Sequence, residues 1–173
     1  MEIPPEKVAR IERFVQNIIQ EKEKETEYKN DCHKKYKRFY TGTLGEAAIE
    51  ELLGLDIIDW EIGHSAKFAE ADLRTIGLNV GVKTVEYGSF PVIHKRAKRP
   101  EIINVKLSDN QVLVCGFAFR SILDCYQDIE LIKSPALRQK GTKTGFYGFD
   151  KLVPISTLNS LTLLQKLDKL KST

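Results

Sequence analysis

Apolar residues at helical spacing define the beginning of the chain. In the segment 5–36, Val8 and Ile11 lie on one face, and apolar residues return on that face one and two turns later. This period is typical of an amphipathic helix. The apolar stripe fades in the second half of the segment, which we expect to be a solvated helical arm. The segment 42–54 predicts a second helix, because Gly54 suits its C-terminal stop.

Apolar and polar residues alternate in the middle of the chain, as they do in half-buried strands. The segments 67–74 and 78–87 predict two strands, joined at residues 75–77. The segment 111–119 predicts a third strand, which is the most apolar of the three.

The last third of the chain predicts further helices and one more strand. The segment 121–132 suits either a helix or a helix followed by a strand, and 143–155 suits a strand with a proline stop. Ser156 predicts the cap of a closing helix. The apolar positions of this helix are Leu158, Leu161, Leu164 and Leu167.

This order of elements predicts an α/β or α+β sandwich with a mixed sheet. A chain of 173 residues suits a single domain with a proper core. Within it we distinguish an N-terminal helical extension, residues 1–40, from an α/β domain, residues 41–173.

A lysine interrupts the predicted strand 78–87. Leu78, Val80 and Val82 form its apolar face, so Gly81 and Lys83 point the other way. If this strand pairs with 67–74 as a hairpin, Asp72 shares that polar face with Lys83. An Asp–Lys pair on a solvated surface is common and contributes little to stability. The same pair with a glycine beside it also suits a site where a ligand approaches the backbone.

The preceding helix favours the second interpretation. Glu46 and Glu50 are one turn apart in the predicted helix 42–54, so they share a face. Carboxylate oxygens bind the hard cation Mg²⁺, and an ammonium orients water or offsets charge on a phosphate. Glu46, Asp72 and Lys83 therefore suit Mg²⁺-dependent hydrolysis of phosphodiesters.

These segments resemble the PD-(D/E)xK nuclease superfamily, which includes restriction endonucleases, Holliday-junction resolvases and phage exonucleases. GTLGEAAIEELLG resembles its Glu-bearing helix, AEADLR its Asp strand, and VGVKTV its (D/E)-x-K strand. The resemblance implies a restriction-endonuclease-like core, with a central mixed sheet flanked by helices. It also implies an Mg²⁺-dependent endodeoxyribonuclease that accepts Mn²⁺. In such an enzyme Glu46, Asp72 and the Val82 carbonyl bind the metal, and Lys83 assists the attacking water.

One position departs from this pattern, because Gly81 stands where the motif has its acid. The superfamily allows the carboxylate to come from elsewhere, and the candidates are Glu50 and Glu70. Glu86 faces the wrong way unless a bulge intervenes. The alternative is a catalytically degenerate protein of the same fold that binds nucleic acid or serves in assembly. A third interpretation is an unrelated α/β protein with a surface Asp–Lys pair.

The distribution of basic residues points to a polyanion. The net charge is only +3, but the stretches 34–38, 94–99 and 133–143 each carry four Lys or Arg and no acid. One such stretch is most simply a solvated surface, whereas three together favour DNA as partner through phosphate contacts. The predicted nucleic-acid-binding residues are Lys95, Arg96, Lys98, Arg99, Lys140 and Lys143.

Cysteine content and hydropathy bear on the compartment. Three scattered cysteines are too few for a disulfide framework, and no apolar run approaches the roughly 20 residues that span a bilayer. We therefore expect a cytoplasmic protein without a membrane partner, in a host cytoplasm if a phage encodes it. The oligomeric state stays open, with a homodimer as one alternative.

Overall fold

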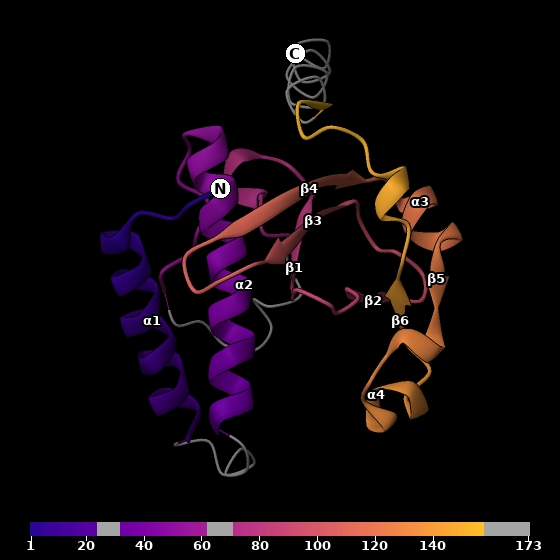
Figure 1. Cartoon of the computed structure of the whole chain (residues 1–173), viewed down its shortest axis with the longest axis horizontal. Coiled ribbons are helices and arrows are strands. Elements are labelled where there is room, and N and C mark those ends of the chain that lie inside the picture. The colour runs from indigo at the N-terminus through magenta and orange to yellow at the C-terminus, as the bar shows by residue number, and fades with distance from the viewer. Residues whose placement is uncertain (24–31, 62–70, 158–173) are drawn as a thin grey trace, which may run out of the picture.

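The computed structural model describes residues 1–23, 32–61 and 71–157, and Figure 1 shows its helices and strands. Two long helices come first, α1 (Pro5–Glu23) and α2 (Cys32–Leu53). Two three-stranded sheets follow, with the short helices α3 (Arg120–Cys125) and α4 (Pro135–Gln139) beside the second sheet. The chain is thus a mixed α/β structure, as the pattern of elements predicted.

The N-terminal helices differ from those predicted. The helix expected over residues 5–36 ends at Glu23, and α2 begins ten residues before Gly42, so the boundary placed at residue 40 falls inside α2. Ile11 and Val15 of α1 are fully buried in the same core as Leu44 of α2. Burial on this scale follows the apolar face that the sequence predicted, and it makes α1 part of the core instead of an extension separate from the α/β domain.

The first sheet has the order β1–β3–β4 and is mixed, as predicted. β1 (Gly81–Glu86) runs parallel to β3 (Glu101–Lys106), and β3 runs antiparallel to β4 (Val112–Ala118). β4 confirms the strand predicted over residues 111–119. The sequence analysis did not identify β3, which is the central strand of the sheet.

The hairpin predicted between residues 67–74 and 78–87 is wrong. Residues 67–70 lie outside the described part of the chain, and Arg74–Ile76 form a single 3₁₀ turn. Gly77 ends this turn with φ of 81°, a conformation that favours glycine. The Leu73 amide donates to the Val80 carbonyl, and the Leu78 amide donates to the Leu73 carbonyl. These two hydrogen bonds close a compact loop, and the outer edge of β1 has no partner strand among the described residues.

The second sheet has the order β2–β6–β5 and is antiparallel. It consists of β2 (Val92–His94), β5 (Gln127–Asp128) and β6 (Lys143–Phe146). The helix α3 followed by β5 settles the ambiguous segment 121–132 as a helix and then a strand, and β6 confirms the strand predicted from Lys143. The predicted closing helix from Leu158 onward lies outside the described residues.

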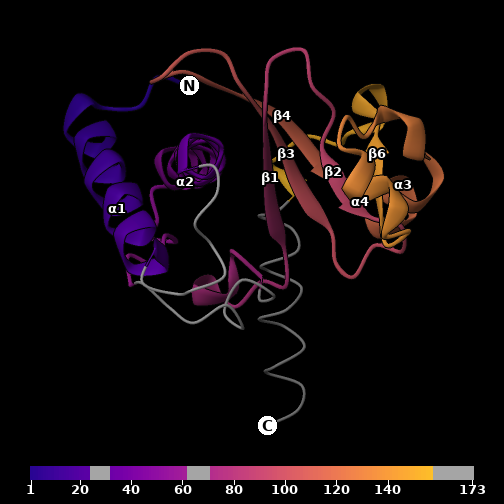
Figure 2. The ribbon, with the colours of Figure 1, turned by 90° about the horizontal axis from the view of Figure 1, so that it is seen from below.

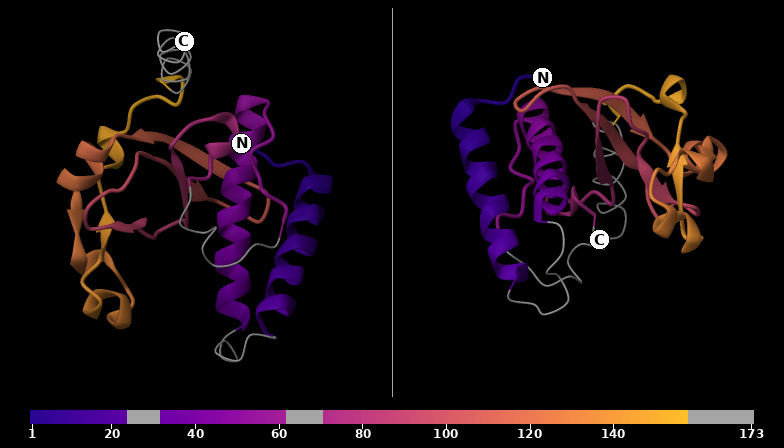
Figure 3. Two further views of the ribbon diagram at one scale, coloured as in Figure 1. Left: turned by 180° about the vertical axis from the view of Figure 1, so that it is seen from behind. Right: turned by 60° about the horizontal axis from the view of Figure 1, so that its bottom comes forward.

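The elements stack in four layers. Figure 2 shows α2 end-on between α1 and the first sheet, with the second sheet and its short helices on the opposite face. Figure 3 shows α1 and α2 side by side from two further directions. One core lies between the helices and the first sheet and contains Ile102, whereas a second core contains Ile103 and lies between the two sheets. Because side chains alternate along a strand, Lys83 belongs to the face toward the second sheet.

Candidate active site

The contact between α2 and β1 depends on a helical glycine. A Cβ atom built on Gly45 would lie 2.6 Å from Thr84 Cβ, so the helix packs against β1 only without a side chain there. The Asn104 side-chain amide of β3 donates to the Gly45 carbonyl at 3.2 Å. This close approach holds the part of α2 that carries Glu46, the next residue, against β1.

Asp72 reaches the same place from the loop before β1. Its Oδ2 atom accepts a hydrogen bond of 2.6 Å from the backbone amide of Val82. The Val82 amide is available because β1 is an edge strand whose outer side has no partner in the described residues. Asp72 is therefore fixed beside the (D/E)-x-K-like segment, although not by the hairpin that the sequence suggested.

Glu101 fills the space that a side chain at Gly81 would occupy. Glu101 is paired directly with Gly81 in the parallel register of β1 and β3. A Cβ built on Gly81 would lie 2.8 Å from Glu101 Cδ and 3.1 Å from Oε1, and closer still to Oε2. The carboxylate of the neighbouring strand thus lies where the motif's own acid would begin. Glu101 was not predicted as a site residue. The feature that could have indicated it is an acid directly before the mostly apolar segment 102–105.

Burial raises the proton affinity of Glu46, Asp72 and Glu101, and the charge of Asp72 adds to the effect on the two glutamates. Burial, followed by the negative charges of Asp72 and Glu50, raises the pKa of Glu46 to about 8. Burial also raises the pKa of Asp72, although the Val82 amide and Lys83 oppose this shift. Burial and Asp72 raise the pKa of Glu101 against the effect of Lys83. Burial disfavours ionised carboxylates and like charges add to the effect, so this cluster suits a bound cation.

Lys83 lies at the centre of this charge arrangement. Its ammonium acts electrostatically on Glu46, Asp72 and Glu101, which come from α2, the loop before β1 and β3 respectively. Among the described residues, neither Glu46, Lys83 nor Glu101 has a hydrogen bond or an ion pair. Glu46, Asp72 and Lys83 are thus close enough to act on one another electrostatically, and Glu101 lies within reach of Asp72 and Lys83 as well. Their predicted convergence on one metal ion stays a prediction.

The other acids proposed from the sequence are placed differently. Both oxygens of buried Glu50 are engaged, because Oε1 accepts from the Ile57 and Ile58 amides and Oε2 pairs with Lys7 at 3.0 Å. Glu50 thus holds the loop after α2 instead of replacing the acid at position 81. Glu86 accepts a hydrogen bond from Thr41 on the α2 face of the sheet, away from Lys83. Glu70 lies outside the described residues.

Glu46, Asp72 and Glu101 offer carboxylate oxygens, which are the ligands that a hard divalent cation prefers. Within residues 1–23, 32–61 and 71–157, no three His, Cys, Asp or Glu side chains form a ready-made metal site. The raised pKa of Glu46, about 8, also favours the protonated form of this carboxyl group. Metal binding would therefore need Glu46 to lose its proton and the carboxylates to move closer together.

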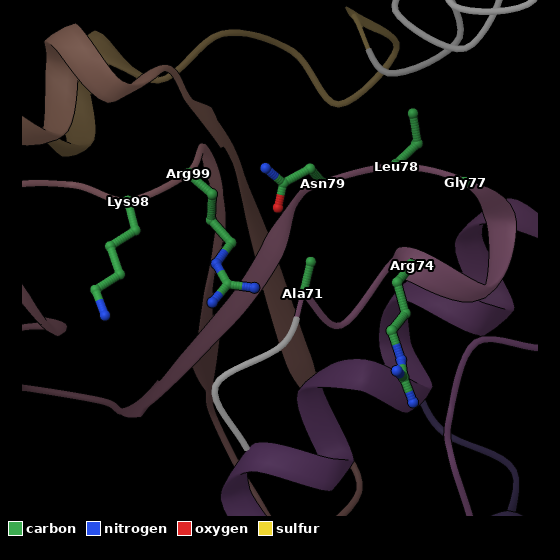
Figure 4. Close-up of a pocket in the computed structure, with 7 residues that line it drawn as sticks. All are labelled: Ala71, Arg74, Gly77, Leu78, Asn79, Lys98 and Arg99. Atoms are coloured by element: carbon green, nitrogen blue, oxygen red, sulfur yellow. The ribbon is translucent and has the colours of Figure 1, made fainter. Parts of the chain in front are cut away.

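A basic pocket lies beside Asp72. The pocket has a volume of about 550 Å³ and is open to solvent. Its lining residues are Ala71, Arg74, Gly77, Leu78, Asn79, Lys98 and Arg99. Figure 4 shows the Arg99 side chain extending toward the segment of Ala71. Arg74 lies on the other side of Ala71, and its side chain points away from Arg99. Two of the predicted nucleic-acid-binding residues, Lys98 and Arg99, thus lie next to the carboxylates.

The other four predicted nucleic-acid-binding residues do not line this pocket. Lys95, Arg96 and Lys140 are exposed, and half-buried Lys143 lies on β6. The aromatic residues of the first basic stretch pack inward: Tyr36 stacks on Tyr40, whose hydroxyl donates to a backbone carbonyl.

Comparisons with known proteins do not extend this description. No family model, no curated protein and no solved structure matches the chain. No helix in the described part of the chain is long and apolar enough to cross a membrane.

Proposed function

We propose that the protein is a metal-dependent nuclease of the PD-(D/E)xK type, in which Glu101 supplies the acid missing at Gly81. The observation that carries this proposal is the position of the Glu101 carboxylate in the space of a Gly81 side chain. The acid of the motif would then come from Glu101 on β3, and its lysine from Lys83 on β1, two residues after Gly81. The proposed reaction is hydrolysis of phosphodiester bonds in DNA.

Each residue has a role that follows from its surroundings. Glu46, Asp72 and Glu101 would hold Mg²⁺ or Mn²⁺, which when bound polarises the phosphate and lowers the pKa of water. Lys83 orients the attacking water and offsets negative charge, because its charge acts on all three carboxylates. Lys98 and Arg99 bind the backbone of the substrate from the adjoining pocket.

Exchange of the two motif positions tests the proposal. Glu101→Gln should lower Mg²⁺-dependent cleavage by about 100-fold or more, since removal of one group stabilising the transition state costs 10²–10³. In the double variant Gly81→Glu/Glu101→Gly, the acid returns to β1 and the space is vacated, so cleavage should recover at least tenfold. Cleavage is measured on duplex, single-stranded and branched DNA.

A matched control keeps this test sharp. Glu130→Gln removes an exposed carboxylate that pairs only with Arg138 among the described residues, and it should cleave like the wild type. Thermal unfolding verifies that each variant is folded. Full activity of Glu101→Gln would remove Glu101 from the site, and the proposal would lose the observation on which it rests.

The second candidate is a nucleic-acid-binding protein that has lost its chemistry. Gly81 favours it, whereas half-buried Glu46, which has no hydrogen bond or ion pair with the described residues, opposes it. A carboxyl group that gains no hydrogen bond from the described residues costs stability when ionised, and a protein that only binds has no use for that cost. DNA binding by the wild type without cleavage, in either Mg²⁺ or Mn²⁺, would support the binder.

A further inference from the structure

Two basic side chains of the second sheet are in contact with each other. Lys143 on β6 stands opposite His94 on β2, and Lys143 Nζ lies 2.9 Å from His94 Nε2. The ammonium donates to His94 only while Nε2 of the imidazole is unprotonated. Among the described residues no other hydrogen bond or ion pair of Lys143 is found, so two ammonium hydrogens remain for a ligand.

The surroundings of this pair are strongly positive. Burial and then Lys143 lower the pKa of His94, and burial followed by Lys83 and Lys98 lowers the pKa of Lys143. The charged groups that act on the pair are Lys83 on β1, Lys98 and Arg99 before β3, and Glu101 on β3. Together with Lys143 this makes four cations and one carboxylate. An excess of like charges of this kind is stabilised when an anion binds.

The place of the Lys143–His94 pair beside the carboxylate cluster indicates which kind of anion it binds. Lys143 is close enough to Lys83 and Glu101 for each to affect its pKa, and Lys98 also lines the pocket beside Asp72. Lys83, Lys98 and Lys143 therefore lie near one another and near the carboxylate of Glu101, and such a group of cations suits phosphates of a nucleic-acid strand. Ammonium groups form short, charge-assisted hydrogen bonds with phosphate oxygens.

We propose that Lys143, His94 and Lys98 form a phosphate-binding site for the phosphate next to the one that is cleaved. The neighbouring role rests on the proposed nuclease function, whereas the binding of a phosphate does not require cleavage. The ligand is either an internal phosphodiester of the backbone or a terminal phosphate, since both present the same oxygens. His94 holds the Lys143 ammonium in place while its Nε2 atom is unprotonated.

The experiment measures binding in EDTA, so that metal-dependent cleavage cannot occur. A fluorescent DNA duplex with a 5′-phosphate and the same duplex with a 5′-hydroxyl are titrated with wild type, Lys143→Gln and Lys143→Arg. Lys133→Gln is the matched control, because it removes the same charge from an exposed lysine that is not among the predicted nucleic-acid-binding residues. We expect Lys143→Gln to weaken binding about tenfold and to reduce the salt slope by about 0.9. Lys143→Arg and Lys133→Gln should stay within about twofold of wild type.

The outcomes distinguish the two phosphate sources and the two proposals. An effect of Lys143→Gln on the 5′-phosphate duplex alone assigns a terminal phosphate, and an equal effect on both duplexes assigns the backbone. Equal affinities of Lys143→Gln and Lys133→Gln on both duplexes would overturn the phosphate site. If Lys143→Gln does not fold, Lys98→Gln takes its place with the same expected loss. Lack of cleavage by the wild type in Mg²⁺ would instead overturn the nuclease proposal and leave this result standing.

Discussion

The geometry of a single pair, Gly81 and Glu101, changes the interpretation of the sequence. A glycine at the acid position of the motif suggests lost chemistry, but the parallel register brings the Glu101 carboxylate into the same space. A residue 20 positions away thus replaces a local one. Sequence motifs describe positions along a chain, whereas a bound cation responds only to positions in space.

Glu46 should make the stability of the protein depend on pH. Its pKa is raised from the usual 4.5 to about 8 in the folded state, so folding favours the protonated form. The corresponding stability is fully present below about pH 4.5 and is lost as the pH rises toward 8. Glu46→Gln imitates the protonated form, and its melting temperature should exceed that of the wild type increasingly from pH 5 to pH 9.

Scanning calorimetry in a series of buffers measures this difference. Glu51→Gln serves as control, because this acid of α2 is exposed and pairs with Lys7 outside the carboxylate cluster, so its curve should run parallel to that of the wild type. Parallel curves for wild type and Glu46→Gln would mean that Glu46 ionises normally.

At the scale of elements, α2 has two separate tasks along its length. Gly45 lets the helix approach β1, and one turn later Glu50 fixes the loop that follows the helix. Glu46 and Glu50 share a face, as the sequence predicted, yet their environments differ. The first has no hydrogen-bond partner among the described residues, whereas the second has three.

Glu50→Ala should therefore destabilise the fold. The substitution leaves the Ile57 and Ile58 amides and the Lys7 ammonium without their acceptor, and the loss should be about 2–4 kcal/mol. Urea unfolding measures it as a lower midpoint at unchanged slope. Glu51→Ala removes the other carboxylate bound to Lys7 and should cost less than about 1 kcal/mol. Equal effects of the two variants would contradict a structural role for Glu50.

At the scale of the whole molecule, a bound metal should link folding to proton release. A Mg²⁺ concentration ten times the dissociation constant stabilises the folded state by about 1.4 kcal/mol, or roughly 3–6 °C in melting temperature. Because Glu46 must lose its proton first, this shift should be larger at pH 8 than at pH 6.

Differential scanning fluorimetry follows the shift with Mg²⁺ and Mn²⁺, against NaCl of equal ionic strength. Asp72→Asn should abolish the shift, since a neutral amide replaces a carboxylate ligand. A shift that is independent of pH, or that persists in Asp72→Asn, would separate metal binding from the carboxylate cluster.

The sequence by itself determined the local features of the protein. The period of apolar residues gave both N-terminal helices, the strand over 111–119 and the strand from Lys143, because each pattern reflects burial of one face. It also indicated Glu46, Asp72 and Lys83, since their residue types and order already suggest metal-assisted chemistry. The predicted boundaries of these two helices were wrong between α1 and α2, because the local pattern of apolar residues carries little information there.

Only the tertiary structure decided which distant residues meet. The β1–β3 pairing depends on a parallel register, and no periodicity in either strand encodes the register with its partner. For the same reason the sequence did not predict the compact loop that carries Asp72 to the edge of β1, the contact of Lys143 with His94, or Glu101 beside Gly81. The identities of most site residues are thus local information, whereas their assembly follows from packing between elements.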